Sequence, residues 1–288
     1  MEGEFENAKL ANRAACKACP HVCTPAEGRF GRCGARRNIG GKVNCDNYGR
    51  ITSLALDPIE KKPIARWQSG TTVLSLGSYG CSMDCPFCQN SSIARAGADD
   101  VVWREMAPEE VIEQALALKR RRCIGIAYTY NEPLVSWEFV RDTAQLAHEA
   151  GLANVLVSNG MATEAVLDEV APLVDAANID LKCFSDEGYR ALGGDFETVK
   201  RTIETFAALP TCHLEVTTLA VPGISDDDAQ MDATASWLAS VDPAIPYHIT
   251  RFFPQHRMRS VPPTPIAALR RLADIAAQHM GDVMLGNV

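Results

Sequence analysis

The chain has 288 residues, of which 47% are hydrophobic and 22% charged, and its formal net charge is -8. A chain of this length buries a large core, as one αβ barrel or as one domain with a small appendage. The acidic balance excludes a general basic footprint, so we expect no nucleic-acid partner. The first ten residues are too polar for a signal peptide, and no apolar run approaches membrane-spanning length. We therefore expect a cytoplasmic protein that does not bind a membrane.

Eleven cysteines are the most unusual feature of the composition. Disulfide frameworks occur mainly in small secreted domains, and this chain is neither small nor equipped for export. Several of the cysteines also fall into short-spaced groups. We therefore expect thiols that bind a metal or an iron–sulfur cluster in a reducing compartment.

Two segments of different character divide the chain. Residues 1–68 are rich in Cys, Gly and Arg and show only weak alternation, which predicts an irregular, metal-binding N-terminal cap with a few short strands. Residues 69–288 alternate apolar strands with amphipathic helices. The predicted strands are 72–77, 124–129, 154–158, 177–182, 213–220 and 247–252. The predicted helices are 108–121, 136–150, 163–171, 196–208, 226–240 and 265–279.

Six strand–helix units in a row, joined by short connections, predict a parallel sheet with right-handed crossovers. The pattern alone fits a partial barrel or an open doubly wound sheet. In both architectures ligands bind at the carboxyl ends of the strands. We therefore look for residues that could bind a ligand or take part in catalysis directly after each predicted strand.

Three cysteines follow the first predicted strand in the stretch SYGCSMDCPFCQN. Cys81, Cys85 and Cys88 can each hold one iron of a cube-shaped iron–sulfur cluster, because soft thiolates suit that metal. The fourth iron then has no protein ligand and is free to bind a substrate. The alternatives are buried thiols or part of a four-ligand zinc site, for which no fourth ligand is evident near residues 81–88.

This loop resembles the radical S-adenosylmethionine (SAM) superfamily, whose hallmark is CxxxCxxC with an aromatic residue, here Phe87, before the last cysteine. The resemblance implies a partial (β/α)6 TIM-like barrel with a Cys-rich N-terminal cap. It also implies a [4Fe-4S] cluster whose open iron is chelated by SAM. One-electron reduction then cleaves SAM to methionine and a 5′-deoxyadenosyl radical, which abstracts hydrogen from a substrate.

Two further strand ends extend the resemblance. In YTYNEP, Asn131 and Glu132 stand where the superfamily has a Gly-Gly-Glu-Pro turn, and a carboxylate there accepts a hydrogen bond from the SAM ammonium. In VSNG, Ser158 and Asn159 resemble a turn of the glycyl-radical activases, which implies that they lie near the methionine moiety.

The next strand ends match activases as well. In NIDLK, Asp180 and Lys182 match an Asp-Leu-Lys motif and point the same way along their strand. In PYHITRF, His248 matches a histidine that touches the ribose, and Asn90 matches an asparagine of the cluster loop. Thr217 stands near the place where activases usually have an arginine, so substrate contacts of activases are not carried over.

A second group of cysteines lies in CKACPHVCTPAEGRFGRC. Cys16, Cys19, Cys23 and Cys33 have the spacing CxxC-x3-C-x9-C, which predicts a closed tetrahedral zinc site or a second iron–sulfur cluster. Zinc would stabilise a segment that is poor in periodic apolar residues. A cluster could relay electrons to the first one.

The cysteine block, LALDPIEKKPIARW, HLEVTTLAVPG and YHITRFFP together resemble one subgroup. This is the radical SAM member of the AmmeMemoRadiSam system, related to pyruvate formate-lyase activating enzymes. The system is named for co-occurrence with Memo-like and AMMECR1-like proteins, and the resemblance implies both as partners.

The sequence therefore predicts a radical SAM enzyme that forms a 5′-deoxyadenosyl radical and abstracts hydrogen from an unidentified substrate. The first alternative is a glycyl-radical-enzyme activase that acts on a backbone glycine of a partner. The second is a non-catalytic iron–sulfur electron carrier. Reductive cleavage requires a low-potential electron, so we expect a flavodoxin or a ferredoxin to dock near Cys81–Cys88.

Overall fold

A curved, mostly parallel sheet of eight strands forms the centre of the computed structural model, which describes residues 13–288. The strand order is β12-β11-β10-β9-β8-β7-β5-β4, and every neighbouring pair is parallel except β4 and β5. The sheet is open, because β4 and β12 each have a single neighbour. The strands are β4 (Ser53–Pro58), β5 (Thr72–Gly77), β7 (Cys123–Tyr128), β8 (Ala153–Ser158), β9 (Ala176–Asp180), β10 (His213–Ala220), β11 (Tyr247–Arg251) and β12 (Val283–Gly286).

The predicted α/β fold with a parallel sheet is confirmed, and all six predicted strands form within two residues of their expected bounds. The count of six was too low, because β12 adds a seventh parallel strand beside β11. It has only four residues, all of them half-buried, and its apolar run VML is too short to predict a strand. Strand β9 ends at Asp180, two residues before its predicted end.

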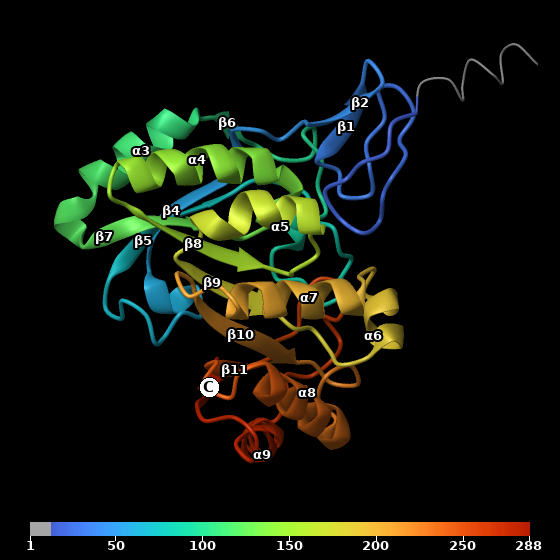
Figure 1. Cartoon of the computed structure of the whole chain (residues 1–288). Helices are drawn as coiled ribbons and strands as arrows, with labels where there is room; N and C mark the ends of the chain where they lie inside the picture. The colour runs from blue at the N-terminus through green and yellow to red at the C-terminus, as the bar shows by residue number, and fades with distance from the viewer. Residues whose placement is uncertain (1–12) are drawn as a thin grey trace, which may run out of the picture.

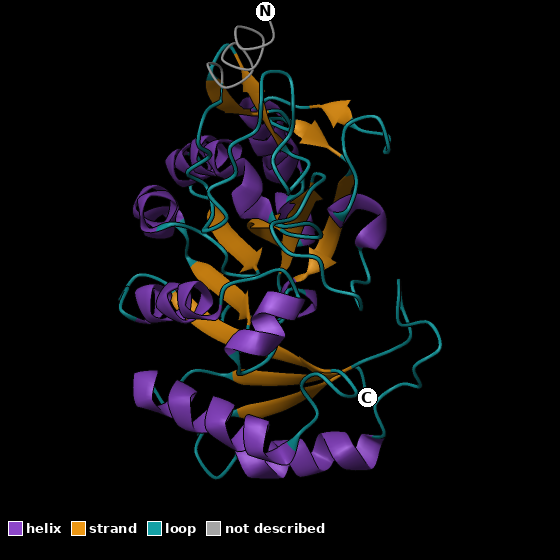
Figure 2. Ribbon diagram, turned by 90° about the vertical axis from the view of Figure 1, so that its right-hand side faces the viewer, coloured by secondary structure: helices purple, strands orange, loops and turns teal. Residues whose placement is uncertain are grey.

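Most of the helices cover one face of the sheet, and Figures 1 and 2 show them along the outside of its curve. Their ends follow local chemistry: the Asp195 and Asp227 carboxylates accept the N–H groups of Thr198 and Gln230 at the first turns of two helices. The longer helices are α3 (Pro108–Ala117), α4 (Trp137–Glu149), α5 (Glu164–Val170), α7 (Phe196–Ala207), α8 (Asp228–Val241) and α9 (Ile266–Ala276).

Two helical predictions need correction. The helix predicted to end at residue 121 ends at Ala117, because a 3-10 turn, η2 (Lys119–Arg121), follows and Arg122 adopts a left-handed φ of 61°. A short helix, α6 (Asp186–Ala191), was not predicted. It contains Gly188, which lowers helix propensity, and only one of its side chains is buried, so it has no apolar stripe.

The other face of the sheet packs on the segment 59–67, which begins with η1 (Ile59–Lys61). Ile59 and Ile64 form a second apolar cluster with side chains of four parallel strands, among them Val73 and Ala176. This segment, which we call the plug, packs inside the curve of the sheet. The carboxyl ends of the strands are left for the site.

The predicted cap contributes to two parts of the structure, and its residues 1–12 lie outside the described residues. β1 (Arg36–Ile39) and β2 (Lys42–Cys45) form a separate hairpin, which Figure 1 shows at the end towards which the β8 and β10 arrowheads point. β4 instead belongs to the main sheet. In residues 13–288 no helix has the length and apolarity to cross a membrane.

Candidate functional site

The three predicted cluster ligands share the loop between β5 and α2 (Ser91–Ala94). Burial raises the pKa of Cys81 above its usual range, and the charges of Glu132, Cys85 and Cys88 add to this effect. Burial likewise raises the pKa of Cys85 to about 12. The three thiols are thus close enough to repel one another as thiolates, and a bound cationic group is what would hold them ionised.

Three thiols on one loop are the donor set of a cluster with one iron on each cysteine. Within residues 13–288 no three His, Cys, Asp or Glu side chains are placed to share a single metal ion. A cube-shaped cluster does not require that, because each thiolate binds a different iron. Phe87, between the second and third ligands, is buried and packs in the main apolar core.

A glycine fixes the start of this loop. Gly80 has a φ of +91°, and a Cβ there would lie 2.6 Å from the carbonyl oxygen of Cys33. The next N–H, that of Cys81, donates to the same oxygen at 3.2 Å. The cap backbone and the cluster loop therefore meet without an intervening side chain.

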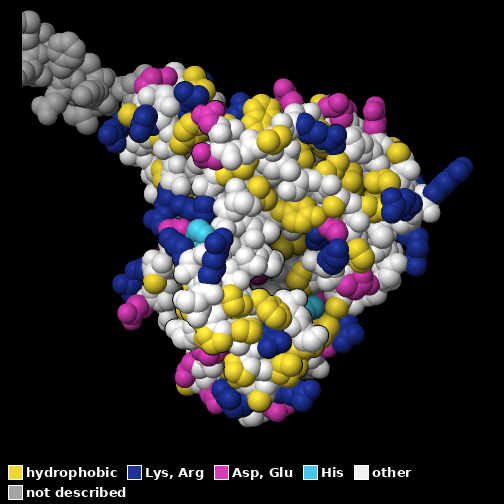
Figure 3. Space-filling view, turned by 180° about the vertical axis from the view of Figure 1, so that it is seen from behind, with side chains coloured by type: hydrophobic (Ala, Val, Ile, Leu, Met, Phe, Trp, Pro, Cys, Tyr) yellow, Lys and Arg dark blue, Asp and Glu magenta, His cyan; other side chains and the backbone are white. Residues whose placement is uncertain are grey.

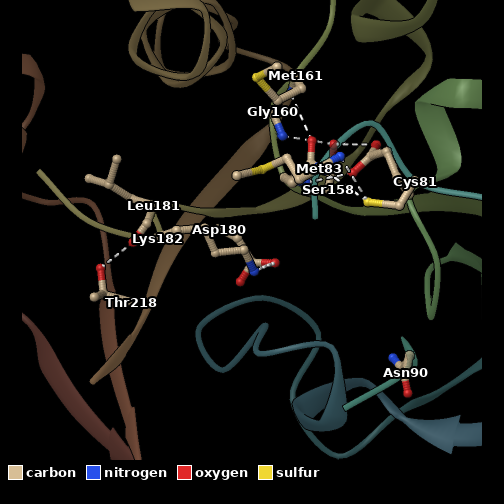
Figure 4. A network of polar contacts seen from close by, with 12 residues as sticks. Cys81, Met83, Asn90, Ser158, Gly160, Met161, Asp180, Leu181, Lys182 and Thr218 are labelled. Atoms are coloured by element: carbon tan, nitrogen blue, oxygen red, sulfur yellow. Dashed lines mark hydrogen bonds and ion pairs between the residues drawn. The ribbon is translucent and has the colours of Figure 1, made fainter. Parts of the chain in front are cut away.

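Two predicted SAM contacts brace the backbone of this loop. Asn131 accepts the Ser78 N–H through Oδ1 (2.9 Å), and its Nδ2 donates to the carbonyls of Tyr79 and Gly80. Asn90 donates to the carbonyl of Tyr130 (2.8 Å). Figure 4 shows Asn90 apart from the other labelled side chains. Their contact with SAM stays a prediction.

Glu132 forms the polar centre of the site. It is buried, and its Oε1 accepts the Ser158 hydroxyl (2.7 Å) and the Leu134 N–H (3.0 Å). Its Oε2 accepts the Asn159 N–H (2.8 Å). Burial raises the pKa of Glu132 to about 7, although these hydrogen bonds oppose the shift. An approaching cation would stabilise the ionised form.

Asn159 connects this carboxylate to the thiols. Its Nδ2 donates to the Ser82 hydroxyl (3.1 Å) and lies 3.5 Å from the Cys81 sulfur. Figure 4 shows the Cys81 thiol beside the turn that carries Ser158 and Gly160. The ends of β5, β7 and β8 are therefore joined through side chains that the sequence had singled out.

Asp180 and Lys182 form an ion pair of 2.8 Å at the end of β9. Burial alone would lower the pKa of Lys182, but the charges of Asp180, Cys85 and Cys88 outweigh it and raise that pKa. The predicted common direction of the two side chains is thus seen. Lys182 places a half-buried positive charge near the cluster ligands.

His248 lies farther inside the curve. Its Nε2 donates to the Glu215 carboxylate (2.5 Å), which also accepts His213 Nε2 (2.8 Å) and the plug N–H groups of Ala65 and Arg66. Burial would raise the pKa of Glu215, but these donors lower it to about 2. Contact between His248 and the SAM ribose stays a prediction.

Sequence reasoning missed Glu215, although one signal was available. A carboxylate between Leu214 and Val216, in the interior of the predicted strand 213–220, is unusual, because buried charges require partners. The neighbouring Thr217 is paired in register with Asp180 and His248. Its buried hydroxyl has no hydrogen-bond partner among the described residues.

A second missed group joins β4, the plug and Tyr130, which follows β7. The Asp57 carboxylate accepts Lys62 Nζ (2.8 Å) and the Tyr130 hydroxyl (2.6 Å). Burial would raise the pKa of Asp57, but these hydrogen bonds lower it far below its usual range. The stretch DPIEKKP reads as a charged surface turn, yet the Lys62 side chain is buried. Figure 3 shows the hollowed face of the molecule, with Lys and Arg side chains on both sides of the hollow.

A partial barrel with three convergent thiols after its first parallel strand, and a buried carboxylate at the next strand end, defines a class of cluster-binding α/β proteins. A family model described as the Radical SAM superfamily matches residues 76–237, more than half of the chain. The chain belongs to this superfamily, which uses a [4Fe-4S] cluster and SAM.

Two curated proteins illustrate the relationship. The uncharacterized protein MJ0808 of Methanocaldococcus jannaschii is 37% identical over 279 residues, covering 96% of this chain and 82% of that protein. The pyruvate formate-lyase 1-activating enzyme of Escherichia coli K12 is 28% identical over 156 residues, covering 52% of this chain. That match spans only 61% of the activating enzyme.

Solved structures share the fold. Streptococcus suis SuiB bound to precursor peptide SuiA superposes with a TM-score of 0.58 at 11% identity, over 79% of this chain and 51% of that one. TYW1 with a lysine-pyruvate adduct bound gives a TM-score of 0.53 at 16% identity, over 79% and 83%. At these identities the likeness concerns the fold alone.

Proposed function

We propose that this chain is a radical SAM enzyme that binds a [4Fe-4S] cluster through Cys81, Cys85 and Cys88 and abstracts hydrogen from an unidentified substrate. When bound, the cluster and SAM supply a 5′-deoxyadenosyl radical by one-electron cleavage. The observation that supports this most strongly is the buried Glu132 carboxylate, held beside the thiol loop by Ser158 and Asn159.

The chain's own residues orient the cosubstrate. Glu132 accepts the SAM ammonium, an interaction that is stronger than a neutral hydrogen bond because both groups are charged. Ser158 and Asn159 fix the carboxylate, and its Oε2 accepts a single N–H among the described residues, so it can accept the cation as well. Asp180 and Lys182 line the same strand edge, where we place the methionine and ribose ends of SAM. The plug limits entry of water from the opposite end of the strands.

Partners are proposed on two grounds. The activating-enzyme relative supports a low-potential redox partner such as flavodoxin or ferredoxin. The sequence resemblance to the AmmeMemoRadiSam subgroup supports Memo-like and AMMECR1-like partners. The four cap cysteines are the proposed site of a zinc ion or a second cluster.

A second candidate is a glycyl-radical activase, which the 28% identity to the activating enzyme favours. Thr217, in place of the arginine that activases usually have, speaks against it. Incubation with candidate glycyl-radical enzymes and SAM would give an EPR doublet for an activase. A doublet would identify the substrate as a backbone glycine of the partner enzyme.

The deciding experiment measures 5′-deoxyadenosine made by anaerobically reconstituted, reduced protein and by a Cys85→Ala variant. We expect product from the wild type and none from the variant. A wild-type protein that holds its cluster yet neither binds SAM nor forms product would instead be an electron carrier.

A further inference from the structure

The four cap cysteines line one pocket. Its wall includes Cys16, Cys19, Cys23 and Cys33, together with Arg36. Its floor is apolar and comes from the barrel: Leu134 and Val135 in η3 (Pro133–Ser136) and Met161. The predicted thiol group is thus assembled at a boundary between the cap and the barrel.

Backbone contacts hold these thiols together. The Cys16 N–H donates to the Cys23 carbonyl (2.8 Å), and the Val22 N–H donates to the Cys19 carbonyl (3.2 Å). The Arg32 N–H points to the Cys23 sulfur at 3.5 Å. Four thiols gathered on one pocket are the donor set of a metal ion or an iron–sulfur cluster.

Arg36 provides an independent indication of a ligand. It is 6% exposed, its Nη atoms bond to Glu138 (2.7 and 2.6 Å) and the Val135 carbonyl, and its Nε is buried with no partner among the described residues. A buried donor without an acceptor is destabilising. An anionic sulfur centre in the pocket would accept this hydrogen bond.

We propose that the cap pocket holds a second iron–sulfur cluster that passes electrons to the first. Four thiols along the wall of a pocket suit a cluster, because four sulfurs bound at about 2.3 Å to one zinc ion leave no space between them. The pocket also adjoins the first site. Cys81 N–H donates to the Cys33 carbonyl (3.2 Å), and His21 Nε2 donates to the Ser82 carbonyl (2.9 Å).

The floor strengthens this connection. Leu134 N–H donates to the Glu132 carboxylate, and Met161 N–H donates to the Asn159 side chain (2.9 Å). Leu134 and Met161 thus both contact residues that we assign to SAM binding. A structural zinc ion does not have to lie next to the Cys81–Cys88 loop, whereas a cluster that relays electrons must lie next to the centre that it reduces.

The relay moves one electron at a time. A low-potential protein donor such as reduced flavodoxin would give one electron to a cluster held by the cap cysteines. That electron would then pass to a cluster held by Cys81, Cys85 and Cys88, which would return the cap cluster to its oxidised state. This relay rests on the proposed function, whereas the metal site in the cap does not.

The first test is metal analysis of the full chain after anaerobic reconstitution. A variant with Cys81, Cys85 and Cys88 all changed to Ala should keep about four iron atoms per chain and, after reduction with dithionite, show a [4Fe-4S]+ EPR signal, and the wild type should hold about twice that iron. Cys19→Ser with Cys23→Ser should lose half of the wild-type iron. Cys212→Ser, outside both groups, should lose none. Zinc at one per chain, or no metal, in the triple variant would overturn the proposal.

A second variant keeps the proposal testable if the cap of the cysteine variants fails to fold. Arg36→Lys keeps a charge beside Glu138 but removes Nε. In the triple-alanine background it should keep the iron and shift the reduction potential to a more negative value, because a donor to the cluster sulfurs is lost. An unchanged potential would show that Arg36 does not face the cluster and would contradict the assigned pocket.

Electron donors separate the relay from the proposed function. In the Cys19→Ser, Cys23→Ser variant, 5′-deoxyadenosine formation with reduced flavodoxin should fall at least tenfold, while formation with dithionite persists. Equal loss with both donors would overturn the relay. If the wild type holds two clusters and forms no product with either donor, the proposed function fails and the second metal site stands.

Discussion

The Nε2 atom of His248 lies 2.5 Å from the Glu215 carboxylate inside the partial barrel, and the same carboxylate accepts two N–H groups of the plug. Strand β11, strand β10 and the plug are therefore held by a single side chain. Arg66 of the plug also binds Asp282 ahead of β12 (2.5 and 2.8 Å). The plug thus connects the inside of the sheet to its last strand.

Glu215 is expected to make stability depend on acid pH. Its pKa is about 2 in the folded chain against an ordinary 4.5, so its stabilisation is complete above pH 4.5 and is lost as pH falls towards 2. Glu215→Gln should unfold more easily at pH 7 by about 3 kcal/mol, and the difference from wild type should shrink at pH 3. Urea unfolding at both pH values measures this, with exposed Glu204→Gln as control. A constant difference would contradict the shift.

Lys62 and Lys61 offer a matched pair, because both bind Asp57 but their side chains are 4% and 66% exposed. Lys62→Met leaves a buried carboxylate without its main partner and should destabilise the fold by about 3–5 kcal/mol. Lys61→Met should cost less than about 1 kcal/mol. Thermal unfolding of the two variants tests this, and equal losses would mean that the plug pairing contributes nothing beyond surface charge.

The site residues at strand ends were predictable, whereas the interior ones were not. Glu132, Ser158 and Asp180 each follow an apolar run, and the carboxyl ends of parallel strands meet at one edge whatever the exact topology. Glu215 and Lys62 depend on the path of the plug. That path has no local period, since it is fixed by contacts such as Ala65 to Glu215, 150 residues apart.

Roles within the site were harder to predict than positions. Asn131 lies at the expected strand end, but its amide is occupied by backbone groups of the cluster loop. A motif places a residue in sequence without showing which neighbour its side chain will bind. Arg36 illustrates the converse, because nothing in its sequence surroundings indicates a buried guanidinium at a thiol pocket.

Replacement of Gly80 is expected to destabilise the contact between the cap and the cluster loop. An alanine Cβ would lie 2.6 Å from the Cys33 oxygen and 2.8 Å from Ala35 Cβ, in addition to the strain of φ +91°. Gly40 has a φ of +62° with nothing within 4 Å of a Cβ, so Gly40→Ala isolates the backbone strain, about 1 kcal/mol. Gly80→Ala should cost about 1–3 kcal/mol more. Chemical unfolding measures both losses of stability. Equal losses would show that the cap backbone moves away from the alanine side chain at no further cost.

SAM binding is expected to depend on the ionisation of Glu132. Its pKa of about 7 means that the carboxyl is mostly neutral at pH 6 and mostly ionised at pH 8, and only the ionised form attracts the ammonium strongly. SAM affinity of the cluster-loaded protein should therefore rise as pH increases through 7. Glu132→Gln should bind roughly 10- to 100-fold more weakly at pH 8, as the loss of one charge-assisted hydrogen bond predicts, and without this pH dependence.

Equilibrium dialysis of SAM at pH 6, 7 and 8 measures the effect, and Glu204→Gln on α7 is the control that should keep the wild-type profile. A profile that is flat in the wild type but weaker in Glu132→Gln would mean that the carboxylate is already ionised by the cluster's surroundings. A variant that binds as tightly as wild type would move the ammonium away from Glu132. The SAM site would then have to be sought at Asp180, the other carboxylate at this strand edge.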